Sequence, residues 1–563
     1  MSTASATATS ITMATPGLLA RLVGLGSVFG KTFRDSRRTA VLLGLVTALI
    51  LLVTSASVAG EFSTIEKRLG IAAQMAALPE IFQGMLGRMI NIERIGGFLS
   101  WRTINFLPII LGIWTIVAMS GLLAGELARG SLDLLAASPL GRARLALEKV
   151  GGYLLALLLT TVMFAIAAWS AIAAFGTLPM DPVGADAVGA HAAWLFVVAL
   201  LPGALAFAVA PLLGRGGALA AGGLTLFGSF IVSGYSQSVS FFQNLEPLSY
   251  LSLTASHRPI AGVYDWPAVI IAGGVTAALL VLGVVMFVWR DLLVPTGGRI
   301  RLPSIGLFVG GVFRRSLGER LPASILWGLG LALYGMIIAF SADDFVKALG
   351  GIPEIRQMIA QLFPNVDIVS VGGFLQIAFF SEAILFVAVA TTLLVGGWSS
   401  DEGDRRLELV LSTPTTRVSW AVRSAVAVMT GVAIITGLLV VGVIVGALTQ
   451  TAALDAGQVA IGVSILGLYA MALAGIGLAA GGLVRPNLAA PVTIALALGF
   501  FLWDLVGSIA KFPDVLLDLA LNRHLGQPML GEYDWPGMVL CAVLAIGGVA
   551  LCAIGMRRRD IGR

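Results

Sequence analysis

The side chain with the clearest potential for chemistry lies inside an apolar run. Glu382 stands between Phe380 and Ala383 in the run 374–398. A carboxylate in hydrocarbon costs a few kcal/mol, so such a residue is expected to face a cavity or a polar partner. Three roles are open: a polar point on a substrate path, a proton-binding site, or a protonated side chain that donates an interhelical hydrogen bond.

The few His and Cys residues argue against a metal site, a disulfide or a catalytic triad. The chain has three His and two Cys. Cys541 and Cys552 are eleven positions apart in one apolar run. That spacing is about 16 Å along a helix at about 1.5 Å per residue, too far for a disulfide. Neither a Cys/His metal site nor a Ser-His-Asp triad is expected, and the three His are interpreted as interfacial polar residues.

The segment GLGSVFGKT (24–32) resembles a phosphate-binding loop only in part. That motif needs Gly five residues before Gly30, and Leu25 stands there. No strand precedes the segment and an apolar run follows it, so a helix on the membrane surface is expected. No other stretch offers a nucleotide site. We therefore expect no cofactor in this chain, and any ATP and magnesium that drive it must bind to a separate subunit.

A polar break between long apolar runs occurs twice in the same register. The first copy is ELARGSLDLLAASPLGR (126–142) and the second is DEGDRRLELVLSTPTTR (401–417), aligned without a gap at an offset of 275. One copy alone would indicate an ordinary charged loop, whereas two copies favour a docking element for two identical partners. The candidate docking residues are Glu126, Arg129, Leu132, Asp133, Leu135, Pro139, Arg142, Asp401, Glu402, Leu407, Glu408, Val410, Pro414 and Arg417.

Each copy predicts a short helix with one apolar stripe, over 127–137 and over 402–412. Apolar residues recur at i, i+3 and i+4, which places them on one helix face. A hydroxyl-Pro pair then follows, Ser138-Pro139 or Thr413-Pro414. Each pair is expected to end that helix and to cap the next one, with Pro at its first position. The stripes are Leu132, Leu135 and Ala136, and Leu407, Val410 and Leu411.

These two stretches carry a resemblance to a known family. The pattern E-x-x-R-G-[ST]-L-[DE]-L-L-x-x-[SP]-P-x-[GS]-R resembles the cytoplasmic coupling helix of ABC-type exporter permeases. After residue 16 the chain is similar to double-length permeases of bacterial polyketide or ionophore antibiotic exporters. The second copy departs from the pattern, with Arg405-Arg406 where the first has Gly130-Ser131. The resemblance implies two copies of a separate ABC ATPase, one on each stretch, without a permease homodimer.

Composition places the chain in a membrane. It is 58% hydrophobic and 12% charged, whereas soluble domains carry about 25% charged residues. At about 20 apolar residues per crossing, the sequence predicts an all-α polytopic membrane protein with twelve transmembrane helices. The expected spans are 39–59, 104–125, 149–176, 190–213, 217–237, 267–289, 322–340, 374–398, 419–448, 458–483, 488–508 and 536–556.

Basic residues are distributed unevenly over the segments between these spans. Of 35 Lys and Arg residues, 25 fall on the side of both termini and 10 on the other side. The positive-inside rule therefore puts both termini and both polar stretches in the cytoplasm. This distribution explains the net charge of +5 without a nucleic-acid partner. We expect a location in the bacterial cell membrane, in contact with lipid.

Short motifs recur in the two halves of the chain. GGFL occurs at 96–99 and 372–375, and YDWP at 264–267 and 533–536. Because each half holds six spans, both enter the membrane from the same side, and a pseudo-twofold axis along the membrane normal would relate them in parallel. The expected organisation is a disordered N-terminus (1–16), a first six-span half (17–300) and a second six-span half (301–563).

The two halves are expected to enclose a central pathway. The place of Glu382 in the first half is near Phe106, which gives the candidate path residues Asn105, Phe106, Phe379 and Glu382. The segments 238–263 and 509–532 look like outer re-entrant helices that gate a pathway, or else partly buried interfacial loops. The candidate gate residues are Phe241, Phe242, Phe512 and Leu516.

Further helices are expected outside the spans. The basic amphipathic segments 17–37 and 304–320 suit helices that lie on the inner membrane surface. The segments 61–99 and 343–372 suit small helical caps on the outer side.

The favoured function is the membrane subunit of an ATP-driven ABC exporter for hydrophobic or amphipathic compounds, either drug-like or lipid-like, and not an enzyme in itself. An alternative is an ion-coupled carrier that uses Glu382 as its proton site, and a third is a membrane assembly scaffold. An ATPase encoded next to this chain would favour the exporter over the carrier. A scaffold predicts no stimulated ATP hydrolysis in the purified complex.

Overall fold

The computed structural model describes most of the chain as a bundle of long helices. The described residues are 27–76, 89–123, 141–236, 240–289, 311–343, 346–347, 370–403, 406–448, 456–509 and 512–559. Within these ranges twelve helices are long and apolar enough to cross a membrane. The strands found there are β1 (Gly526–Gln527) and β2 (Glu532–Tyr533), which pair as one short hairpin. The predicted all-α class and twelve spans are confirmed.

The spans of the first half come from five continuous helical regions. One of them, α10, supplies two spans because Gly214 breaks it with φ of 71°, a conformation that Gly adopts at little cost. Another is assembled from α5, η1 and α6. The elements are α2 (Val28–Glu61), α5 (Ile95–Arg102), η1 (Ile104–Phe106), α6 (Leu107–Gly121), α9 (Arg142–Phe175), α10 (Ala185–Tyr235) and α13 (Trp266–Trp289).

The second half contributes six further spans. A π-helical turn (η4) lies between α17 and α18, and such turns occur often at functional sites. The elements are α14 (Val312–Phe340), α17 (Val371–Leu375), η4 (Gln376–Phe380), α18 (Ser381–Gly403), α20 (Arg417–Ala447), α21 (Ala456–Leu483), η5 (Pro486–Leu488), α22 (Ala489–Ile509) and α24 (Trp535–Arg558).

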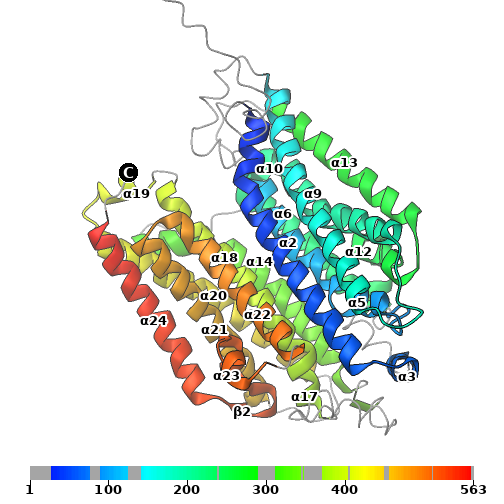
Figure 1. The fold of residues 1–563 in the computed structure, drawn as a ribbon. Helices are drawn as coiled ribbons and strands as arrows, with labels where there is room; N and C mark the ends of the chain where they lie inside the picture. Colours follow the sequence, from blue (N-terminus) through cyan, green and yellow to red (C-terminus); the bar gives the residue numbers. More distant parts are fainter. Residues whose placement is uncertain are drawn as a thin grey trace, which may run out of the picture.

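The two halves form neighbouring bundles (Figure 1). In the first, α2 packs on α9 and α10 packs on α13; in the second, α14 packs on α20 and α21 packs on α24. The halves meet where α2 contacts α22. They meet again where the rings of Phe227 on α10 and Trp327 on α14 lie 5.4 Å apart. Corresponding helices therefore take part in corresponding contacts, as a parallel repeat predicts.

A repeated corner explains why the GGFL motif recurs. A Cβ on Gly96 would collide with the carbonyl oxygen of Ile260, and one on Gly372 would collide with that of Met529. Each carbonyl belongs to a 3-10 turn, η3 (Pro259–Ala261) or η7 (Pro528–Leu530), which ends at a left-handed glycine. Backbone can approach backbone this closely only where no side chain intervenes.

The surface helices expected at 17–37 and 304–320 are not separate elements where the structure describes them. Residues 28–37 and 312–320 form the first turns of α2 and α14. Ser27 caps α2, its Oγ accepting from the amide of Gly30 at 3.0 Å. Residues 17–26 and 304–310 lie outside the described part.

One outer cap is present as α3 (Ile65–Ala76). Arg68 on this helix is buried and pairs with the buried Asp181 at 2.5 Å. Asp181 also accepts from the amides of Ile95 and Leu178, both at 3.0 Å. The cap is thus held to the entry of α5 and to the loop after α9. Most of the other expected cap, 343–372, lies outside the described residues.

Candidate coupling site

The second polar stretch forms a short helix between two spans at the end of the bundle where α24 also ends (Figure 1). We call residues 401–417 the coupling segment. It contains the end of α18, the helix α19 (Arg406–Leu411) and the start of α20 at Arg417. The described residues of the helix predicted over 402–412 belong to the end of α18 and to α19, and residues 404–405 lie outside the described part.

The expected cap of the following helix was placed too early. Thr416, not Thr413, caps α20, since its Oγ1 accepts from the amide of Ser419 at 3.2 Å. Thr413 instead closes α19, donating through Oγ1 to the carbonyl of Val410 at 2.5 Å. Pro414 lies exposed in the turn between these helices. The prediction of Pro at the first helical position is wrong for Pro414, because Thr415 and Thr416 separate it from Arg417, the first residue of α20.

The first polar stretch is described only at its end. Arg142 is the first residue of α9, just as its aligned partner Arg417 is the first residue of α20. The 275-residue alignment therefore matches the structure at this helix boundary. The remaining candidates of this copy lie within 124–140, outside the described residues: Glu126, Arg129, Leu132, Asp133, Leu135 and Pro139.

The apolar stripe of α19 turns toward the bundle and not toward water. Leu407 is 1% exposed, while Val410 and Leu411 are half-buried against the core. Leu407 is a candidate docking residue, but the chain itself covers its side chain, so it is not free to contact a partner here. The residue that α19 presents to the outside is Leu409, which is 72% exposed, beside the exposed Glu408.

An open pocket lies next to this exposed leucine. Its volume is about 340 Å³, and Leu409 and Val410 form one wall. The guanidinium-bearing side chains Arg315 and Arg423 come from the starts of α14 and α20. Arg315 also pairs with Glu319 at 3.2 Å. The lining residues are Gly311, Val312, Arg315, Ser316, Leu409, Val410, Thr413, Thr415, Trp420 and Arg423. This lining combines an apolar wall with positive charge, so it suits an apolar side chain and a carboxylate.

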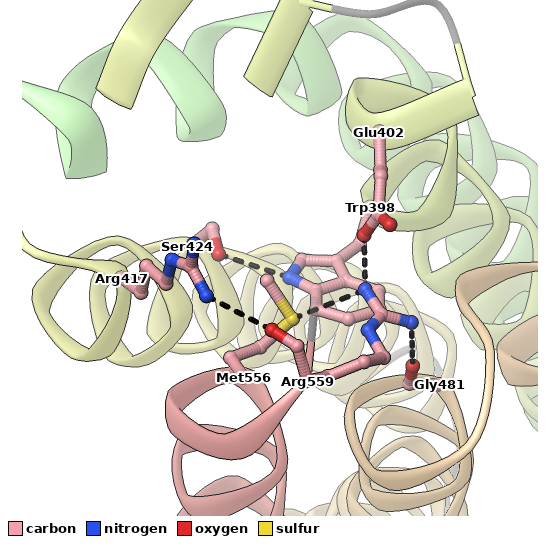
Figure 2. Close-up of polar contacts among 7 residues, drawn as sticks. All are labelled: Trp398, Glu402, Arg417, Ser424, Gly481, Met556 and Arg559. Carbon is pink, nitrogen blue, oxygen red and sulfur yellow. Dashed lines mark hydrogen bonds and ion pairs between the residues drawn. The ribbon is translucent and has the colours of Figure 1, made fainter. Parts of the chain in front are cut away.

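The ends of the coupling segment contact α24 (Figure 2). Glu402 forms an ion pair with Arg559, the residue that follows α24. Arg417 donates to the backbone carbonyl of the same Arg559 at 2.9 Å. Burial raises the pKa of Glu402 above its ordinary value of 4.5, and the charge and hydrogen bond of Arg559 oppose this shift. Asp401 lies in the last turn of α18.

Glu382 lies in the first turn of α18, directly after the π-helical turn. The hydroxyl of Tyr334 on α14 donates to its Oε2 at 2.9 Å. Among the residues that the structure describes, no basic side chain pairs with Glu382. The ring of Tyr334 lies 5.4 Å from that of Phe386, which in turn lies 5.1 Å from Phe227 of the first half. The carboxylate thus lies beside an aromatic cluster that joins both halves.

The other candidate path residues differ in location and burial. Phe379 is fully buried, with its ring 6.0 Å from Tyr334, so it belongs to the same cluster. Asn105 and Phe106 are half-buried in η1 of the first half.

The candidate gates are built from short helical turns. Within the described part, the helices in 238–263 and 509–532 are three to five residues long, so the expected re-entrant helices are absent there and a partly buried loop fits better. The turns are α11 (Ser240–Gln243), η2 (Glu246–Leu248), α12 (Tyr250–Leu253), η3, α23 (Asp514–Leu517), η6 (Leu521–Leu525) and η7. Phe242 is buried and Leu516 is exposed. The ring of Phe512 lies 5.7 Å from that of Trp503, in a tilted arrangement. The side chain of Phe241 lies outside the described part.

Sequence reasoning missed two partners. Tyr334 donates a hydrogen bond to Glu382, 48 positions away, and Arg559 pairs with Glu402, 157 positions away. Of these two partners, only Arg559 could have been noticed in the sequence, because the pair Arg290-Asp291 in the first half recurs as Arg559-Asp560 in the second.

A bundle of twelve span-length helices with a short helix between two of them defines a polytopic membrane protein. Residues 27–292 match the family described as "ABC-2 family transporter protein". Residues 320–557 match "Multidrug efflux system permease Rv1217c, C-terminal domain". Together these two matches identify the chain as an ABC-type permease, a bacterial membrane protein.

A curated relative gives a more particular comparison. The chain is similar to the "Multidrug efflux system permease protein Rv1217c" of Mycobacterium tuberculosis (strain ATCC 25618 / H37Rv), with 26% identity over 318 residues. The match covers 54% of this chain and 55% of the relative, so the chain matches about half the length of that protein. The narrower resemblance to polyketide or ionophore exporters stays a prediction.

Proposed function

We propose that this chain is the membrane subunit of an ATP-driven exporter for hydrophobic or amphipathic compounds. Two copies of a separate ABC ATPase dock on the cytoplasmic side, one on each polar stretch, and hold the ATP and magnesium. The observation that carries the proposal is α19, a short helix outside the spans that presents Leu409 beside the pocket of Arg315 and Arg423.

The proposed docking surface at α19 consists of the side chains that the helix bundle leaves exposed. Leu409 is exposed although it is one of the larger apolar side chains, and burying a Leu stabilises an interface by about 1.5–3 kcal/mol. The two arginines next to it favour an acidic group on the ATPase. An apolar anchor with a charged rim is the usual composition of a protein interface.

The transported compound is proposed from two observations. The matched relative is named for multidrug efflux, and the candidate path combines Glu382 with the rings of Tyr334, Phe379 and Phe386. Aromatic side chains bury large apolar area, which suits drug-like or lipid-like molecules. We place the path between two parallel six-span halves, with both termini in the cytoplasm.

A second function has one observation in its favour. Glu382 lies within a span and has a hydroxyl but no basic partner among the described residues. Carriers driven by protons use such carboxylates. In that case substrate flux would follow a pH gradient in the absence of ATP.

Docking is tested by replacing Leu409 with Asp in the chain coexpressed with the ATPase. We expect the affinity of this one dock to fall at least tenfold, about the loss of one buried Leu, so that copurified ATPase drops from two copies toward one per chain. Leu248→Asp is a matched control, because Leu248 is 81% exposed in η2, on the opposite side of the proposed topology. Leu407→Asp is unsuitable, since that buried change would damage the fold. Normal ATPase binding by Leu409→Asp would exclude α19 as the docking element.

A further inference from the structure

We propose that Arg559 is the positioning residue that joins the coupling segment to the last span, so that movement of α19 reaches α24 and α21. The inference rests on the proposed function, because it assigns the route by which docking acts on the membrane helices. Arg559 is not among the residues that the coupling pattern contains.

The first observation is that one residue contacts both ends of the segment. The side chain of Arg559 pairs with Glu402 at the end of α18, and its backbone carbonyl accepts from Arg417 at the start of α20 (Figure 2). Arg559 also donates through Nη1 to the carbonyl of Gly481 on α21 at 3.2 Å. The ends of four spans are therefore connected through a single guanidinium and its own carbonyl.

The second observation is that the ion pair between Arg559 and Glu402 is shielded from water. The side chains of Arg559 and Glu402 are 15% and 18% exposed. Ion pairs in such surroundings are weakly screened, and the planar guanidinium can serve two acceptors with fixed geometry. The pair thus constrains the end of α18 much more than an exposed pair would.

The third observation is the close fit of α24 on α21. A Cβ on Gly482 would collide with the backbone of Cys552, and one on Gly555 would collide with the backbone of Gly482. Helices that approach this closely move together, since small residues let their backbones pack without gaps. A displacement at Arg559 therefore moves the α21–α24 pair as a unit.

A separate brace holds α18 near the same place. The indole of Trp398 is 1% exposed and donates to Ser424 on α20 at 2.9 Å (Figure 2). Its ring lies 5.6 Å from that of Trp420. Because this brace does not involve Arg559, loss of the arginine should leave the span ends folded while it frees the coupling segment.

The first test uses the chain alone and needs no ATPase. Spin labels at Leu409→Cys and Arg557→Cys report the distance between α19 and α24; the native Cys541 and Cys552 are fully buried. We expect a narrow distance distribution in the parent chain and a broadened one with Arg559→Gln. Arg558→Gln is the matched control, being the exposed neighbour at the end of α24. An unchanged distribution with Arg559→Gln would overturn the proposal.

The second test measures transport per ATP hydrolysed in the complex with the ATPase. Arg559→Gln should keep the ATPase bound but lower this ratio about 2- to 30-fold, the range found for residues along coupling networks. Glu402→Gln should act alike and the double variant no worse, because both changes break one pair. Arg559→Lys should be intermediate, since one ammonium replaces a fork of donors.

The two tests separate the inference from the function beneath it. If the parent chain binds no ATPase, the proposed function fails, while the distance measurement still judges the role of Arg559. If the ATPase binds and the transport ratio of Arg559→Gln equals that of Arg558→Gln, the positioning role is refuted and the docking proposal stands. Equal loss of ATPase binding in Arg559→Gln and Leu409→Asp would also contradict it, since positioning requires that docking survive.

Discussion

At the scale of single residues, long-range partners decide what each polar side chain can do. The apolar surroundings of Glu382 are evident from its neighbours in the sequence, and they indicate a polar partner. That the partner is Tyr334, on α14, depends on how two spans pack. Leu407 and Leu409 illustrate the same limit. The spacing predicted an apolar face at Leu407, Val410 and Leu411, but the contact of α19 with the bundle makes this face an inner one.

Glu382→Gln tests the role of the carboxylate. The amide keeps the size and can still accept from Tyr334, but it loses the ionisable proton. We expect the fold and ATPase binding to be retained and transport to change. Transport is measured between about pH 6 and 8, the range in which buried carboxyl groups can titrate.

The control for this variant is Tyr334→Phe, which removes the hydroxyl that donates to Glu382 and also lies 3.2 Å from the carbonyl oxygen of Ala378. Such a hydrogen bond is worth about 0.5–1.5 kcal/mol to a neutral acceptor and about 1.5–3 kcal/mol to a charged one. Identical transport by Glu382→Gln and the parent chain at every pH would reduce Glu382 to a structural contact.

At the scale of elements, apolar run length was enough to locate the spans. Each of the twelve expected spans overlaps a helix of the structure. The boundaries were less well predicted, because α2 and α14 continue from basic residues into the spans without a break. The cap at Thr416 was missed for a similar reason, since Thr413, Thr415 and Thr416 all precede α20 closely and only geometry selects among these three threonines. The first-half coupling residues and the gates stay predictions.

Gly372→Ala tests the corner that both halves repeat. The added methyl meets the Met529 carbonyl, and overpacking of this kind costs about 1–3 kcal/mol. The melting temperature of the purified chain should fall. Gly330→Ala is the matched control, because a Cβ there meets nothing within 4 Å and Ala is the better helix former by about 1 kcal/mol. Equal melting temperatures for both variants would show that the corner is not tightly packed.

At the scale of the whole molecule, repeated motifs coincide with repeated helix contacts, and the pseudo-twofold axis stays a prediction. Motifs recur at near-constant offsets, and the structure places the same helix pairs and the same glycine corner in each half. Six spans per half give both copies one orientation, so each half can offer its polar stretch to the same compartment. The sequence could predict this arrangement because the same motifs occur in both halves of the chain. The recurrence of Arg290-Asp291 as Arg559-Asp560 marks Arg559 in the sequence, but its contact with Glu402, 157 positions away, could not be predicted.

The central claim is that ATP hydrolysis by a docked partner drives export through this chain. It is tested most directly by uptake of a fluorescent hydrophobic drug into inside-out vesicles that contain the chain and its ATPase. We predict uptake that requires ATP, persists when an ionophore collapses the proton gradient, and falls with Leu409→Asp but not with Leu248→Asp. Uptake driven by a pH gradient without ATP, and unchanged by Leu409→Asp, would contradict the account.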